Sequence, residues 1–215
     1  KLAAIKDIAW IRILYCYPEE IDDALIEVIK NEPKVCHYLD MPIQHASDSI
    51  LKKMGRRTTK QELKDVINKL RENIPDIALR TTLITGFPGE TQKDHEEMLD
   101  FVDEMEFDRL GVFTYSPEED TPAAVMPDQI DEEVKEQRRD AVMELQQEVS
   151  LDKSEEMVGK VIDCLIEGKI EDDDTYYHHF DCPNWQDQKY QLFNTNLADE
   201  LGYIPCPDCW YSGLI

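Results

Sequence analysis

Polar side chains and glycines follow four apolar segments of this chain, and their types could take part in chemistry. The set combines an imidazole, amide and hydroxyl groups, a thiol and a glycine-containing turn, at Cys16, Tyr17, Gln44, His45, Ser47, Thr85 to Glu90, Tyr115 and Ser116. It contains no nucleophile and base at a spacing that would indicate catalysis, and no paired carboxylates. These residue types therefore suit a rim that holds a polar, nucleoside-sized ligand whose reactivity comes from a cofactor.

The turn in residues 81–91, TTLITGFPGET, joins an apolar strand to a helix. Gly86 and Gly89 flank Phe87-Pro88, so the backbone can turn sharply and approach a ligand closely. Open and closed α/β sheets bind their ligands at this end of a strand. The alternative is a strand-to-helix turn that binds nothing.

Three arginines are candidates for binding an anion. Arg80 lies within the central strand, where a charge is costly unless it is paired. It suits a ligand carboxylate, or alternatively a structural ion pair with an acid at the rim. Arg56 and Arg57 follow a glycine and could grip an anion or lie free in solvent.

The elements that position these residues alternate between strand and helix. Apolar segments rich in β-formers predict strands near residues 10–15, 35–41, 77–84 and 109–115. The central one resembles strands that are buried on both faces. Helical periodicity lies between the strands, and a long charged helix is predicted from about 131 to 154. This order predicts an α/β fold with a parallel sheet, either open or part of a barrel.

The pattern changes after this helix, and we expect two domains, 1–155 and 156–215. The second loses helical periodicity and is predicted to be a small, mostly β domain. It carries 12 acids and 3 bases. Cys206 and Cys209, with Cys182 and a His pair upstream, match zinc spacing only weakly, so ordinary thiols are the favoured interpretation.

Charge and hydropathy exclude some classes of function. Among the 215 residues, 47 Asp and Glu against 23 Lys and Arg give a net charge of -24. This charge makes direct nucleic-acid binding unfavourable and favours a basic partner. The alternative is that the charge serves solubility alone. No apolar run is long enough for a membrane span and no signal peptide is visible, so we expect a cytoplasmic protein. The start at Lys1 suggests a piece of something longer.

Several separate motifs together resemble the radical S-adenosylmethionine methylthiotransferases. They are YLDMPIQHAS at 38–47, MGRR at 54–57, ALRTTLITGFPGET at 78–91 and FDRLGVFTYS at 107–116. The likeness covers about residues 1 to 168. It implies the later part of a partial (β/α)6 barrel followed by a TRAM-like β domain.

The resemblance also implies cofactors and residue roles. Such enzymes use S-adenosylmethionine and two 4Fe-4S clusters, one of which generates a 5′-deoxyadenosyl radical. By similarity, Gln44, His45 and Ser47 would face the ribose or methionine part, and Arg80 the carboxylate or reaction centre. Adenine would contact Ile84, Gly86 and the backbone from Phe113 to Tyr115. The cysteines that bind both clusters are absent here and would lie upstream of Lys1, so this piece alone should be inactive.

The variant motifs favour members of the family that modify an aspartate of a ribosomal small-subunit protein. A basic ribosomal protein would also suit the negative charge. Two alternatives stay open: a tRNA methylthiotransferase, and a non-catalytic acidic module that binds proteins.

Overall fold

The computed structural model describes residues 1–161, 176–177 and 204–205. The chain divides into two compact units, Lys1–Val158 and Gly159–Ile215. In the second unit, strands β5 (Tyr176–Tyr177) and β6 (Ile204–Pro205) pair in parallel. Most of this unit lies outside the described residues, so the predicted boundary at 155/156 and the TRAM-like assignment stay predictions.

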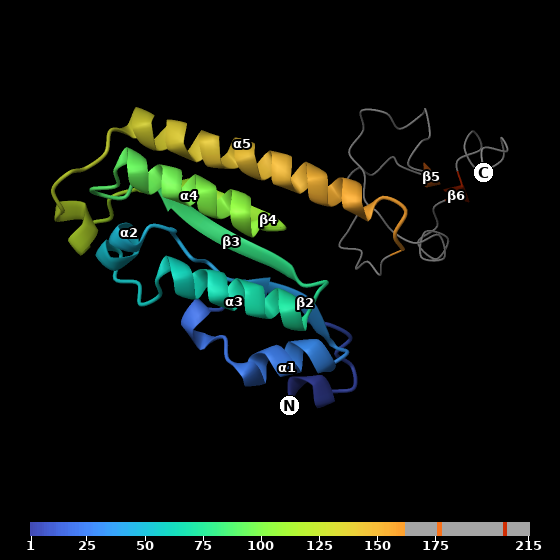
Figure 1. The fold of residues 1–215 in the computed structure, drawn as a ribbon. Helices are drawn as coiled ribbons and strands as arrows, with labels where there is room; N and C mark the ends of the chain where they lie inside the picture. The colour runs from blue at the N-terminus through green and yellow to red at the C-terminus, as the bar shows by residue number, and fades with distance from the viewer. Residues whose placement is uncertain (162–175, 178–203, 206–215) are drawn as a thin grey trace. The chain divides into compact units, whose positions relative to one another are not determined.

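The first unit is built on a parallel sheet of four strands in the order β1-β2-β3-β4 (Figure 1). The strands are β1 (Ile11–Ile13), β2 (Val35–Asp40), β3 (Ala78–Thr85) and β4 (Arg109–Thr114). All three pairs of neighbouring strands run parallel through helical crossovers, which confirms the predicted α/β class. Only β1 is much shorter than its apolar segment.

The described residues form five α-helices, three of which begin at a capping side chain. They are α1 (Asp23–Asn31), α2 (Asp48–Lys53), α3 (Lys60–Asn73), α4 (Gln92–Met105) and α5 (Glu132–Met157), with 3-10 turns at Leu2–Ala4, Pro18–Glu20 and Pro122–Val125. Thr59 with Glu62, and Thr91 with Asp94, form capping boxes for α3 and α4. Each box satisfies backbone N–H groups that the first helical turn leaves free.

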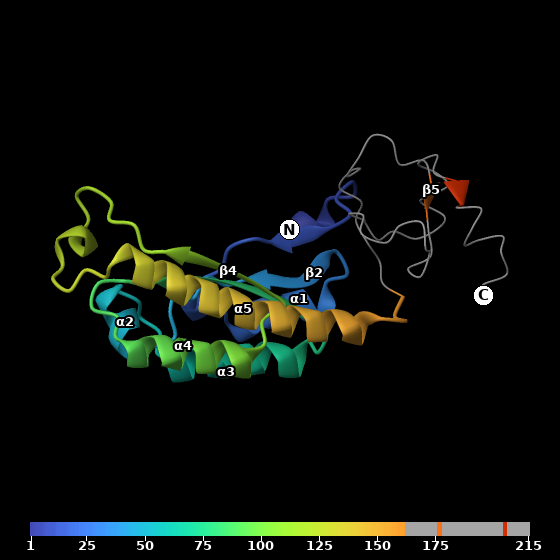
Figure 2. The same ribbon diagram turned by 90° about the horizontal axis from the view of Figure 1, so that it is seen from above.

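The long helices α3, α4 and α5 lie on one side of the sheet, as the view from above shows (Figure 2). Their apolar stripes bury Leu39, Leu79 and Leu83 of the strands completely. The opposite face of β3 is only partly covered. Along the strand, buried residues therefore alternate with half-exposed or exposed ones. The prediction of a strand buried on both faces is therefore wrong, because the helices cover a single face.

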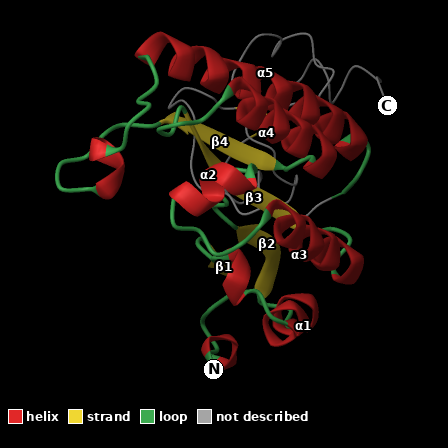
Figure 3. Ribbon diagram, turned by 60° about the vertical axis from the view of Figure 1, so that its left-hand side comes forward, coloured by secondary structure: helices red, strands yellow, loops and turns green. Residues whose placement is uncertain are grey.

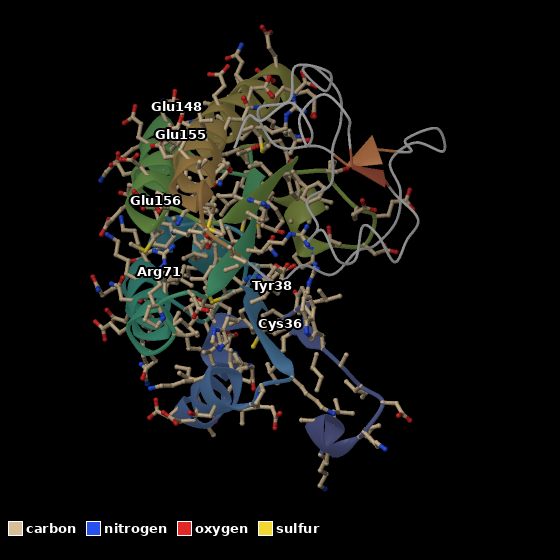
Figure 4. The ribbon with its side chains drawn as sticks, turned by 90° about the vertical axis from the view of Figure 1, so that its right-hand side faces the viewer. Cys36, Tyr38, Arg71, Glu148, Glu155 and Glu156 are labelled. Carbon is tan, nitrogen blue, oxygen red and sulfur yellow. The ribbon has the colours of Figure 1, made fainter. Side chains whose placement is uncertain are left out.

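Charge is distributed unevenly over the first unit. Helix α5 carries nine acidic and four basic side chains, and Glu148, Glu155 and Glu156 project from it in Figure 4. The bare face of the sheet instead carries Arg12 and Arg80, both exposed. Helix α5 is thus an acidic surface of this unit, whereas the bare face of the sheet carries positive charge.

Candidate functional site

A cavity of about 690 Å³ lies at the carboxyl ends of β3 and β4. Four of the predicted site residues line it, namely Gln44, Ile84, Phe113 and Tyr115. The rest of the lining comes from the α2 region and from the segment that follows β4: Lys53, Met54, Gly55, Arg56, Phe87, Thr114, Ser116, Thr121, Pro122, Ala123 and Met126. The parallel register brings these strand ends together, since Ile84 is the partner of Phe113.

Gln44 reaches the cavity because the chain continues pairing with β3 beyond Pro42. Its N–H donates to the Thr82 carbonyl at 2.9 Å, and its own carbonyl accepts from Ile84 at 2.8 Å. The residue has φ 71°, a left-handed conformation that side chains other than glycine seldom adopt. Such strain is typical of functional sites, where the surrounding structure holds it in place.

His45 and Ser47 lie next to the cavity wall but do not line it. Both are buried, and the Ser47 N–H donates to Nδ1 of His45 at 2.9 Å. The Ser47 hydroxyl donates to Asp94 at 2.6 Å, as does Ser49. Burial alone would raise the pKa of Asp94, but hydrogen bonds from Ser47, Ser49 and Thr91 outweigh it and hold that pKa below its usual range. The carboxylate therefore ties α2 to the start of α4.

The turn after β3 is held by one buried carboxylate. Glu90 accepts the N–H groups of Gly86 at 2.6 Å and Phe87 at 3.2 Å, and it pairs with Arg138 of α5 at 3.0 Å. Nε2 of His45 lies 3.6 Å from it. Glu90 was predicted at the rim, whereas Arg138 was not, because its only signal was a cation on the apolar side of an otherwise charged helix.

Gly86 and Gly89 are required for a reason other than ligand approach. Both have positive φ, and the space that a side chain at Gly86 would need holds the Lys135 stem. At Gly89, Lys53 occupies the corresponding space. Lys135 in turn donates to the Tyr115 carbonyl at 2.9 Å. Gly86 thus leaves room for Lys135, which holds helix α5 against the cavity floor. Gly86 itself does not line the cavity.

The floor of the cavity is aromatic. Phe87 and Tyr115 meet edge to face, with ring centroids 5.2 Å apart. Tyr115 is 9% exposed, and its hydroxyl is buried without a partner among the described residues. Phe113 is 65% exposed and presents a large apolar surface at the cavity's edge.

Arg80 is paired within the protein. Its Nη1 donates to Asp40 at 3.1 Å, so of the two interpretations raised above the structure contains the ion pair with an acid. Burial raises the pKa of Asp40, although Arg80 and Arg12 act in the opposite direction. Arg80 lies four residues before Ile84 on β3 and does not line the cavity. Arg56 does line it, and its guanidinium also stacks 5.2 Å from the Tyr17 ring.

Two features bear on metals and membranes. Among residues 1–161, 176–177 and 204–205, no group of three His, Cys, Asp or Glu is arranged to hold a metal ion. Cys182, Cys206 and Cys209, considered above as a weak zinc match, lie outside the described residues. No helix in the described part of the chain is both long and apolar enough to cross a membrane.

Comparison with known proteins adds independent findings. Residues 1–102 match the radical SAM superfamily. The chain is 60% identical over 186 residues to "Ribosomal protein uS12 methylthiotransferase RimO" of Lachnoclostridium phytofermentans. The aligned region covers 86% of this chain and 42% of that protein. The protein of the same name from Clostridioides difficile is 55% identical over 172 residues, or 80% and 39% of the two chains.

A solved structure shares the fold. Coproporphyrinogen III oxidase (HemN) from Escherichia coli, described as a radical SAM enzyme, superposes with a TM-score of 0.55 at 22% identity, over 65% of this chain and 32% of that one. The present chain spans about two fifths of the length of the curated relatives it matches. The resemblance to radical SAM methylthiotransferases is confirmed.

Proposed function

Because this chain carries a radical SAM domain over residues 1–102, we propose that it forms part of a methylthiotransferase that modifies an aspartate of a ribosomal small-subunit protein. The observation that carries the proposal is the cavity at the ends of β3 and β4, whose lining suits an adenosyl group. Identity of 53–60% to several proteins of that activity supports the substrate class. The whole protein would belong in the cytoplasm, where ribosomes are modified.

The cavity residues fit S-adenosylmethionine. A volume of about 690 Å³ is within the range of small-molecule sites. Phe113 and Ile84 offer apolar surface for adenine, while Gln44 offers polar contacts. Arg56 at the rim supplies positive charge for a carboxylate. When bound, S-adenosylmethionine and the 4Fe-4S clusters supply radical and sulfur-transfer chemistry, which the side chains of this chain lack.

The predicted roles of the remaining residues change in this proposal. Ser47 positions the segment after Gln44 through its hydrogen bonds to His45 and Asp94, and Glu90 positions the turn that carries Phe87. Arg80, paired with Asp40, sets the electrostatics of the bare sheet face. These residues would keep the cavity rigid, so that ligand binding costs little conformational entropy.

Charge supports a protein substrate over a nucleic acid. A net charge of -24 would repel RNA phosphates and attract a basic ribosomal protein. A tRNA methylthiotransferase and a non-catalytic acidic module remain as outcomes that an experiment separates.

The test uses the full-length protein, reconstituted anaerobically with iron and sulfide and supplied with S-adenosylmethionine and a reductant. Mass spectrometry of a ribosomal small-subunit protein and of tRNA, incubated in parallel, should show a methylthio group on an aspartate of the former only. Gln44→Ala should lower the yield strongly, whereas Gln61→Ala, an exposed glutamine on α3, should leave it unchanged. Modification of tRNA alone, or of neither, would refute the proposal.

A further inference from the structure

Strand β4 is an end strand whose outer edge has unused hydrogen-bonding groups. Among the described residues it pairs with β3 only. Tyr115, one residue beyond the strand, donates its N–H to Thr85 of β3 at 2.8 Å. Since residues of a parallel strand alternate between their two neighbours, the backbone groups of Leu110, Val112 and Thr114 point away from β3. Figure 3 shows β4 at this end of the sheet. Such an edge is a template for another extended chain.

The two ends of this edge each border a cavity. The cavity of about 690 Å³ includes Phe113 and Thr114 at the carboxyl end of β4. A second, of about 360 Å³, lies at the amino end between β4 and α5 and is lined by Arg109, Leu110, Met143, Gln146, Gln147, Ser150, Leu151 and Ser154. Side chains of an added strand alternate between the two faces of the sheet. One set would point toward the bare face and the first cavity, and the other toward the groove along α5.

The bare face beside the edge has room for such side chains. Gly111 has no atom within 4 Å of the position that a Cβ would occupy. Its neighbour Phe113, on the same face, is 65% exposed. A side chain directly opposite on an added strand would cover this ring, which is the kind of cross-strand contact that stabilises sheets.

The charges near the edge define the occupant. Glu118, Glu119 and Asp120 lie in the loop after β4, and all three are exposed. On α5, the exposed Glu136 lies two helical turns before Met143 and so on the side of the helix that faces the groove. Two cations also lie near the edge: Arg109 at its opposite end, and Arg139 of α5, which pairs with Asp140. The surface therefore complements a segment whose basic residues lie beside the carboxyl end of β4.

We propose that the free edge of β4 is the docking surface for an extended, basic segment of the protein substrate, which adds to the sheet as a further strand. Main-chain hydrogen bonds to residues 110–114 would hold the segment, and the neighbouring cavity would receive the side chain to be modified. This inference rests on the proposed function, because it presumes a protein substrate. It explains how an acidic enzyme could present one side chain of a long polypeptide to a cofactor at the strand ends.

The test is a backbone N-methyl scan of a synthetic peptide that contains the target aspartate of the ribosomal protein. Binding of each peptide to the full-length protein is measured by fluorescence anisotropy. N-methylation blocks one hydrogen bond at a time, so we expect affinity to fall about tenfold or more at every second residue and by less than about twofold between them. A scan without this alternation overturns the inference.

A matched pair of variants tests the same edge from the protein side. Val112→Pro removes an outward N–H together with apolar packing, whereas Val112→Ala removes packing alone. We expect peptide affinity to be at least fivefold weaker in the proline variant than in the alanine variant, with equal binding of S-adenosylmethionine. Equal peptide affinities in two folded variants would contradict the proposal.

Two further outcomes separate this inference from the proposed function. If the enzyme modifies the intact ribosomal protein but the scan shows no alternation, strand addition is wrong and the activity stands. If the peptide scan alternates but no methylthio group is transferred, the activity is wrong. Slow hydrogen exchange of the Leu110 and Val112 amides in the absence of peptide would show that another part of the protein covers the edge, and would overturn the docking surface.

Discussion

Replacing Glu90 by glutamine tests the buried network that holds the cavity floor. The Glu90 carboxylate is fully buried and accepts hydrogen bonds from two backbone N–H groups and from Arg138. Glutamine keeps the shape but removes the charge, and its amide NH2 group then faces a hydrogen-bond donor. Arg138, with its side chain 10% exposed, then loses its charged partner.

The magnitude follows from burial. Breaking a buried ion pair costs about 3–5 kcal/mol, and an exposed pair about 0–1 kcal/mol. Because glutamine retains one acceptor, we expect Glu90→Gln to lower the free energy of unfolding by about 3 kcal/mol. For a chain of this size that corresponds to roughly 6–12 °C in Tm. Glu97→Gln, which affects a pair with Lys60 at the surface, should cost less than about 1 kcal/mol.

Thermal and urea unfolding of the chain, followed by far-ultraviolet circular dichroism at pH 7, measures both variants. The first unit holds helices α1 to α5, so its unfolding is visible in the helical signal. Arg138→Met combined with Glu90→Gln should recover part of the loss, since it removes the unpaired buried cation. A loss below about 1 kcal/mol for Glu90→Gln, or no recovery in the double variant, would refute the role given to this network.

Three further predictions concern the same unit. Burial lowers the pKa of His95, so the unfolded chain binds the proton more readily than the folded chain. The stability that depends on neutral His95 is complete above about pH 6.5. It is lost as the pH falls through the lower pKa of the folded state. The urea midpoint should therefore fall less between pH 7 and 5 in His95→Gln than in the wild type, and equal slopes would contradict this. Asp94→Asn should lower the free energy of unfolding by about 2 kcal/mol at pH 7. Because the pKa of Asp94 is lowered, its stabilising contribution is present above about pH 4 and is lost as the carboxylate is protonated, so the variant should lose less stability than the wild type below that pH. An unchanged fall in stability at acid pH, measured by urea titration, would disprove the assignment. Leu83→Ala, at a fully buried position on β3, should cost about 2–5 kcal/mol by calorimetry, whereas Leu14→Ala, 57% exposed, should cost under about 1 kcal/mol.

Local sequence patterns were sufficient to predict the elements of the first unit. Apolar segments and alternating periods placed all four strands, and the Thr59–Glu62 spacing placed the start of α3. The number of buried faces was not predictable in the same way, because it depends on which side the helices pack. The apolar run in β3 gave no sign that Arg80, Thr82 and Ile84 share a half-exposed face.

The candidate site was predicted in part. Residues at strand ends, such as Gln44 and Phe113, converge because a parallel sheet brings those ends to one edge. Residues whose role depends on tertiary packing were missed or placed differently. Arg138 and Lys135 reach the site from a helix about 50 residues later in the chain, and Gly86 makes room for Lys135. No local spacing records such contacts.

Binding of S-adenosylmethionine to the reconstituted full-length protein tests most directly whether the strand ends form its cradle. Phe113 is mostly exposed, so Phe113→Ala should leave the Tm nearly unchanged while removing the surface on which adenine would stack. Stacking contributes about 1–3 kcal/mol, so we predict affinity about tenfold weaker by calorimetry. Trp10→Ala, another exposed aromatic that lies outside the cavity, should bind like the wild type. Wild-type affinity in Phe113→Ala would contradict the account.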